Sequence, residues 1–344
     1  MQKNILNVRV NRYILLYFSL ALSLNLIYLY SFNARGLLFT TSQLGEANDL
    51  NYMLHRASQR GFELDVTWGS RMVMLGLYFS KWLTGSVLSA FLIIPFINSL
   101  LFGRIIKALN VNAVLLPLAL GSITYTMIPG KGAYSLMAVL LAINSSYSLS
   151  THRKLLFFLA AVSVSFLNRP WEILLLLPFV MSYRQISMLM LLCILGGYTI
   201  LDGEILELIK FKIQDRSGFI LEGITEKFGW ILKSENLMVH LFLAPVRIIA
   251  VIISLLTSAL TSAKAAFTEN FLTVLYRLLP LSLRFFDFVL LSFSLKRLIV
   301  KNKISQYILT YMIFISFFGV EEKSRYFLLF SPLLILISRK SRGI

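Results

Sequence analysis

The chain has 344 residues, of which 57% are hydrophobic and only 14% are charged. Its mean hydropathy of +0.76 lies well above that of soluble globular proteins and excludes an ordinary water-soluble domain. The formal net charge of +17 would suggest nucleic-acid binding in a soluble protein. Here the basic residues follow a membrane pattern, so no nucleic-acid partner is expected.

The N-terminus resembles a signal peptide, because Lys3, Arg9 and Arg12 precede a long apolar run. The run is too long for the apolar region of a signal peptide, and no small-x-small cleavage site follows it. We therefore expect it to be the first membrane span and to be retained.

Apolar stretches long enough to cross a membrane recur along the chain. We expect spans at about 13–32, 86–106, 111–128, 132–150, 155–168, 171–183, 186–201, 277–295, 304–319 and 326–338. Two further apolar stretches, 66–84 and 241–262, contain basic residues and are expected to be interfacial or re-entrant helices. The sequence thus predicts an all-α polytopic transmembrane helical bundle, a single domain over residues 1–344, with about ten spans plus two interfacial or re-entrant helices.

Charge sets the expected orientation of this bundle. In the ten-span arrangement the cytoplasmic segments hold many basic residues and no acidic one, as the positive-inside rule requires. These basic residues are Lys3, Arg9, Arg12, Arg104, Lys107, Arg153, Lys154, Arg184, Lys296, Arg297, Lys301, Lys303, Arg339, Lys340 and Arg342. We predict a multi-pass protein of the cell inner (plasma) membrane with both termini cytoplasmic and with large outer loops at 33–70 and 202–240.

The first outer loop holds four carboxylates, at positions 46, 49, 63 and 65, beside several cations. Most of these charges are expected to be solvated and to pair with one another. Asp49 differs, because apolar residues recur at helical spacing from 49 to 59, as in a helix that lies on the membrane surface. These apolar residues are Leu50, Met53, Leu54 and Ala57. Asp49 would occupy the first turn of that helix, where the helix dipole favours a carboxylate.

Cations also mark the outer ends of several predicted spans. Arg169, within Asn168-Arg169-Pro170-Trp171-Glu172, is either a snorkelling cation or an anion ligand beside a helix N-terminus. Lys131 stands between two glycines, whose backbone N–H groups can approach a bound anion, although a Gly-Lys turn is common. Arg325 either neutralises the two glutamates before it or binds a phosphate at the mouth of a cavity, and Tyr326 suits an aromatic belt.

Several catalytic motifs are absent from the sequence. There is no GxxxxGK[ST], HExxH or GxSxG, so ATP hydrolysis, zinc proteolysis and serine hydrolysis are not expected. The three histidines lie far apart and Cys193 is the single cysteine, so neither a histidine metal site nor an internal disulfide is expected.

Three short motifs occur at characteristic places. An acidic residue follows the first span with a tyrosine close behind, in Asp49-Leu50-Asn51-Tyr52. An interfacial segment ends near a glycine, in Leu83-Thr84-Gly85, and Arg325-Tyr326 precedes a last span that contains Pro332. In these motifs the chain resembles the type-C glycosyltransferase superfamily, multispanning enzymes that take sugars from polyprenyl-linked phosphate donors, and O-antigen and other surface-polysaccharide polymerases. Many members have two adjacent acids where this chain has Asp49-Leu50.

The resemblance implies a membrane glycosyltransferase of surface polysaccharide biosynthesis that works on the non-cytoplasmic face. The reaction needs a base for the acceptor hydroxyl and cations for the phosphate leaving group. The expected catalytic residue is Asp49, and the expected substrate-binding residues are Arg169, Arg325, Lys131, Tyr52 and Tyr326. The expected partners are a polyprenyl-linked sugar or oligosaccharide, membrane lipid and proteins of polysaccharide assembly.

No cofactor is expected, and the departure at Leu50 leaves open the divalent metal that some members use. Two other functions stay open: a polymerase that joins oligosaccharide repeat units, and a lipid-linked oligosaccharide flippase or transporter. A transporter should carry polar residues along a path to both faces. Because the acidic residues avoid the cytoplasmic segments, the sequence favours an enzyme that acts on one side.

Overall fold

The computed structural model describes residues 2–34, 38–39, 49–59, 70–109, 128–148 and 150–168, together with the single positions 172, 173, 176, 185 and 188. These residues are almost all helical, and no strand occurs among them. The elements are α1 (Gln2–Ala34), α2 (Asp49–Gln59), α3 (Arg71–Thr84), the short 3-10 helix η2 (Val87–Ser89), α4 (Ala90–Leu109), α6 (Lys131–Tyr147) and α7 (Thr151–Asn168).

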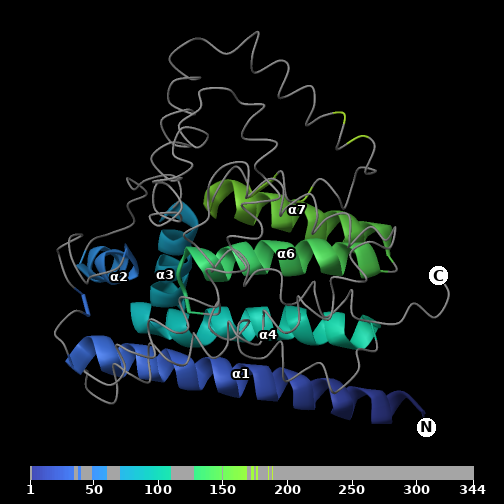
Figure 1. Ribbon diagram of the computed structural model, residues 1–344, viewed down its shortest axis with the longest axis horizontal. Helices are drawn as coiled ribbons and strands as arrows, with labels where there is room; N and C mark the ends of the chain where they lie inside the picture. Colours follow the sequence, from blue (N-terminus) through green and yellow to red (C-terminus); the bar gives the residue numbers. More distant parts are fainter. Residues whose placement is uncertain are drawn as a thin grey trace, which may run out of the picture.

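Four long helices, α1, α4, α6 and α7, lie side by side in that order, and two shorter helices lie at one end of them (Figure 1). Helix α3 runs across the direction of the long helices, with α2 beside it. Near the end of α3, Lys81 Nζ donates to the carbonyl oxygens of Ala57 and Ser58, each 3.0 Å away. These carbonyls belong to the last turn of α2, where a helix leaves acceptors without partners and where its dipole favours a cation.

Aromatic contacts show that α1 and α4 run antiparallel. In the first half of α1, Tyr17 packs edge-on against Phe102 in the second half of α4, with ring centroids 4.6 Å apart. Near the other end of α1, the Tyr28 ring lies 5.7 Å from that of Phe91 at the start of α4. Gly103 lets the two helices approach closely, because a Cβ at this position would overlap the side chain of Ile14.

Helices α6 and α7 form an antiparallel pair that is fixed at both ends. The Asn168 amide at the end of α7 donates to the carbonyl of Lys131, the first residue of α6, over 3.1 Å. At the opposite end Ser145 Oγ donates to the carbonyl of Lys154 over 2.7 Å. The starts of α4 and α6 and the ends of α1 and α7 therefore lie together beside α2 and α3, as Figure 1 shows. We call this the α2/α3 end of the bundle.

A proline inside α4 explains one contact between helices. Pro95 has no N–H, so the carbonyl of Phe91, four residues earlier, loses its usual helical donor. Asn25 on α1 supplies the replacement: its Nδ2 donates to that carbonyl over 3.1 Å, and its side chain is fully buried. An amide on α1 thus donates to the carbonyl of α4 that a proline leaves without its helical donor.

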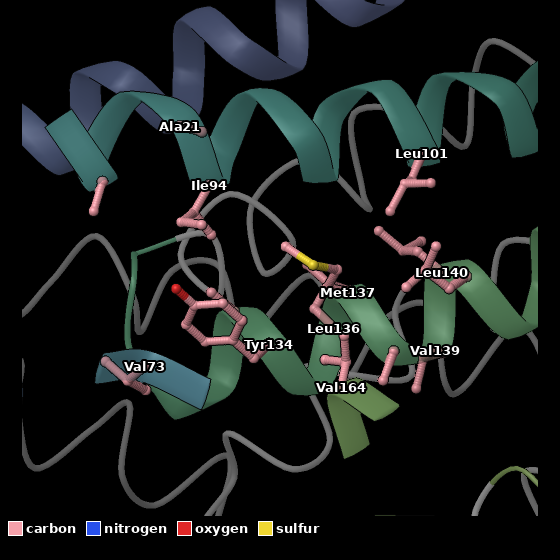
Figure 2. Close-up of a cluster of buried hydrophobic side chains, with 14 of the residues drawn as sticks. Ala21, Val73, Ile94, Leu101, Tyr134, Leu136, Met137, Val139, Leu140 and Val164 are labelled. Carbon is pink, nitrogen blue, oxygen red and sulfur yellow. The ribbon is translucent and has the colours of Figure 1, made fainter. Parts of the chain in front are cut away.

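Helix α6 occupies the centre of the described bundle, and its residues 133–145 are all buried. Figure 2 shows Met137 and Leu140 of α6 facing Ile94 and Leu101 of α4, with the ring of Tyr134 close to them. The Tyr134 hydroxyl points at Gly76 of α3, where a Cβ would overlap it. This glycine is what allows α3 to cross so close to α6.

The described helices bury several polar side chains and expose many large apolar ones. Asn25, Asn98 and Asn168 are completely buried between helices. Large apolar side chains face outward instead, with exposed fractions of 60% for Leu15 and 65% for Leu156. Soluble proteins rarely expose such continuous apolar faces, whereas helix bundles in lipid pair their few polar groups internally.

The described helices agree with the predicted positions. Two stretches, Ile14–Ala34 of α1 and Val87–Ile106 of η2 and α4, are long and apolar enough to cross a membrane. Helix α6 begins one residue before the span predicted at 132–150. Helix α7 begins four residues before the span predicted at 155–168. Apart from a few single positions, the remaining predicted spans, the stretch 241–262 and the loop 202–240 lie outside the described residues.

Candidate functional site

Helix α2 carries two residues of the predicted site, and its packing fixes its position. It begins at Asp49, as the apolar spacing predicted, so this residue occupies the first turn. Its apolar residues Leu50, Met53, Leu54 and Ala57 are all buried. The predicted apolar face is therefore present, but it packs against protein rather than lying free on a membrane surface. Tyr52 is half-buried.

Asn51 shows why the motif around Asp49 has an amide at this position. The Tyr28 hydroxyl, near the end of α1, donates to Asn51 Oδ1 over 3.3 Å, and both side chains are buried. Together with Lys81 at the other end of α2, this contact holds the helix by both ends against the bundle. The backbone that carries Asp49 is thus positioned by α1 and α3.

Lys131 begins α6 at the α2/α3 end of the bundle, and its side chain is half-buried. Gly130 forms the N-cap with extended backbone, and its carbonyl accepts the N–H of Ala133 over 3.0 Å. A Cβ at Gly132 would meet no atom of the described residues within 4 Å, so their packing does not require the second glycine of this turn.

A buried polar cluster lies one turn from Lys131. We call Ser135, Asn168 and Glu172 the carboxylate cluster; each is at most 2% exposed. Ser135 Oγ lies 2.5 Å from Glu172 Oε1, and Asn168 Nδ2 lies 2.9 Å from Ser135 Oγ and 3.3 Å from Glu172 Oε2. In the sequence, Glu172 is the last residue of an interfacial motif, and no role was predicted for it. Glu172 follows Asn168 by four residues, with Pro170 between them. This spacing was the sequence feature that could have indicated that the two side chains lie together.

The opposite end of the bundle has a different character. There the side chains of Thr151, His152, Arg153 and Lys154, at the start of α7, are all exposed. Arg104 of α4 is exposed at the same end, and its guanidinium carbon lies 4.8 Å from the centre of the Phe157 ring. The end that carries Arg104, Arg153 and Lys154 and the end that carries Asp49, Lys131 and Glu172 are thus separated by the length of the long helices.

The remaining predicted site residues, Arg169, Arg325 and Tyr326, lie outside the described residues. Within the described part of the chain, no group of three or more His, Cys, Asp or Glu side chains gathers in a way that could hold a metal ion. The structure therefore brings Asp49, Tyr52 and Lys131 to the same end of the bundle and adds the carboxylate cluster to that end.

Comparison with protein-family models, with curated proteins and with solved structures finds no match to this chain.

Proposed function

We propose that this protein is a membrane glycosyltransferase of surface polysaccharide biosynthesis, which transfers a sugar from a polyprenyl-phosphate-linked donor on the non-cytoplasmic face. One observation carries the proposal: helix α2, which begins at Asp49, and the start of helix α6, at Lys131, lie at the same end of the bundle. The exposed basic residues at the start of α7 lie at the opposite end. A transferase that works on one side of the membrane needs its base and its phosphate-binding cations on that side.

The proposed membrane arrangement is a bundle of about ten spans with two interfacial or re-entrant helices and with both termini in the cytoplasm. Outward-facing leucines on α1 and α7 support lipid as the surroundings of these helices. The course of α3 across the long helices supports an interfacial or re-entrant role for 66–84. The exposed Arg153 and Lys154 suit the cytoplasmic face under the positive-inside rule.

In the proposed reaction the acceptor hydroxyl attacks the anomeric carbon of the donor sugar. Asp49 takes the hydroxyl proton, the new C–O bond forms, and the bond from the anomeric carbon to the phosphate oxygen breaks. Negative charge accumulates on the phosphate of the polyprenyl leaving group, where Arg169, Arg325 and Lys131 stabilise it. As the first residue of α2, Asp49 stands at the helix end where the dipole favours a carboxylate.

Glycan analysis of cells in which the gene is deleted and then restored tests the proposal. Loss of one sugar, regained on restoration, is the expected result for a transferase. Single repeat units on every lipid carrier would indicate a polymerase. Accumulation of the finished lipid-linked oligosaccharide on the cytoplasmic face would identify a flippase and contradict the proposal.

Asp49→Asn is the matched test of mechanism, because asparagine has nearly the same shape and cannot take the proton. We expect transfer to fall by about 10²–10⁴-fold, which is the usual contribution of a general base. Glu63→Gln and Asp65→Asn, in the same loop, serve as controls and should leave transfer unchanged at equal protein levels in the membrane. Normal glycan from Asp49→Asn would remove Asp49 from the mechanism.

A further inference from the structure

The carboxylate cluster contains a buried acid that the proposed mechanism does not use. Glu172 is only 2% exposed, and its carboxylate lies within hydrogen-bond distance of Ser135 and Asn168. A buried carboxylate in a helix bundle of this kind is costly unless its oxygens are bonded, and it is therefore a candidate for a functional role.

The hydrogen bonds of the cluster form a series that runs from Glu172 to the backbone of Lys131. Ser135 has one hydroxyl hydrogen, and its shortest contact, 2.5 Å, is with Glu172 Oε1 rather than with the Lys131 carbonyl at 3.1 Å. Asn168 Nδ2 has two hydrogens, and its shorter contacts are Ser135 Oγ at 2.9 Å and the Lys131 carbonyl at 3.1 Å. Glu172 therefore orients Ser135, Ser135 orients the Asn168 amide, and that amide holds the backbone of Lys131.

We propose that Glu172 is a positioning residue, which acts through Ser135 and Asn168 to hold the first turn of α6 and thereby the side chain of Lys131. The cluster joins the end of α7 to the start of α6 at the α2/α3 end of the bundle. The inference rests on the proposed function only in taking Lys131 to bind the phosphate of the donor. The position of Lys131 itself can be measured without any assay of transfer.

Substitutions at Glu172 separate a positioning role from a chemical one. In Glu172→Gln the contacts can persist: the new side-chain amide donates to Ser135 Oγ, while the two hydrogens of Asn168 Nδ2 go to the Lys131 carbonyl and to the oxygen of the new amide. Glu172→Gln therefore removes the charge and keeps the contacts, whereas Glu172→Ala removes both. Asn168→Ala breaks the last link to Lys131.

A matched control exists at the opposite end of the bundle. Asn144 of α6 is also buried and donates to the carbonyls of Leu101 and Leu140 over 3.0 and 2.8 Å. Asn144→Ala removes the amide contacts to Leu101 and Leu140, whereas Asn168→Ala removes those to Lys131, Ser135 and Glu172. We expect it to loosen the packing of α6 against α4 without touching the first turn of α6.

The experiment measures how fast sulfo-NHS-acetate modifies Lys131 in purified protein in nanodiscs, by mass spectrometry of the peptide that contains it. Asn168→Ala and Glu172→Ala should raise the rate by about fivefold, the effect of losing one hydrogen bond of ordinary net strength. Glu172→Gln and Asn144→Ala should stay near the wild-type rate. In the transfer assay, Glu172→Ala should raise the donor KM more than it lowers kcat, and Glu172→Gln should restore the KM.

Unchanged Lys131 modification in both Asn168→Ala and Glu172→Ala would overturn the proposal. So would an equal increase in Asn144→Ala, because the effect would then be a general loosening. A Glu172→Gln protein with wild-type modification but no transfer would also overturn it, since Glu172 would then act on the substrate itself. If the wild-type chain shows no transfer at all, the proposed function fails while the modification rates still decide the role of the cluster.

Discussion

The contact between Asn25 and the carbonyl that Pro95 leaves without a donor allows a quantitative test of how α1 and α4 are held together. Asn25→Leu keeps the size of the side chain and removes the amide, so the Phe91 carbonyl is left buried without its donor. An unsatisfied buried group costs about 1–3 kcal/mol, and side-chain hydrogen bonds between membrane helices contribute about 0.6 kcal/mol on average and at most about 1.7. We expect Asn25→Leu to lower the free energy of unfolding by about 1.5 kcal/mol, near the upper value for membrane helices.

The same substitution should cost less when Pro95 is absent. In Pro95→Ala the backbone N–H of residue 95 returns and can donate to the Phe91 carbonyl within α4. Asn25→Leu then removes an ordinary contact, and we expect a cost of about 0.6 kcal/mol. The two substitutions should therefore show a coupling of about 0.9 kcal/mol, well above the ~0.3–0.5 kcal/mol that independent sites show.

Reversible unfolding of the four proteins in mixed micelles, with SDS as the denaturant, measures this coupling. Asn144→Leu is the control, because Leu101 lies inside α4 and residue 105 supplies its carbonyl with a normal helical donor. Its cost should be the same with and without Pro95. Additive costs for Asn25→Leu and Pro95→Ala would refute the explanation that the amide replaces the missing backbone donor.

Two further predictions concern packing and orientation. Gly76→Ala should destabilise the protein by about 1–3 kcal/mol, because its Cβ would overlap the Tyr134 hydroxyl, and Tyr134→Phe should recover part of that loss in the same unfolding assay. In a chain without Cys193, a cysteine at the exposed position 153 should react with a membrane-impermeant maleimide only from the cytoplasmic side, and one at the exposed position 58 only from the outside. Labelling of position 153 from outside would contradict the ten-span arrangement.

Helix positions could be predicted from the sequence because they depend on local periodicity. The apolar spacing that begins at Asp49 predicted α2 with its observed bounds, Asp49–Gln59. The end of α3 was also predictable, because Gly85 adopts a positive φ of 79° and its N–H donates to the Lys81 carbonyl, as at many helix ends. Each of these features involves residues within a few positions of one another.

Contacts between distant residues could not be predicted in this way. The bond between Asn168 and Ser135 joins residues 33 positions apart, and nothing in the local pattern of either helix identifies the partner. Lys81 is one of the basic residues in the stretch 66–84, and its role as the cation at the end of α2 follows only from the packing of α3 against that helix. The environment of Glu172 depends on the same kind of contact.

The buried amides indicate how a bundle of this composition selects one arrangement of its helices. In the proposed membrane arrangement, apolar side chains gain little by moving from a lipid contact to a helix contact, so hydrogen bonds and close approach would specify which helices meet. Four asparagines of the described helices each donate to a backbone carbonyl of a neighbouring helix: Asn25, Asn98, Asn144 and Asn168. Because a carbonyl can accept a second hydrogen, such bonds need no matching side chain on the partner helix.

Only at the α2/α3 end, within the described helices, does one of these amides also contact a carboxylate, that of Glu172. The other three amides bond their neighbouring helices without a carboxylate, which agrees with the proposal that the carboxylate of Glu172 serves to position Lys131.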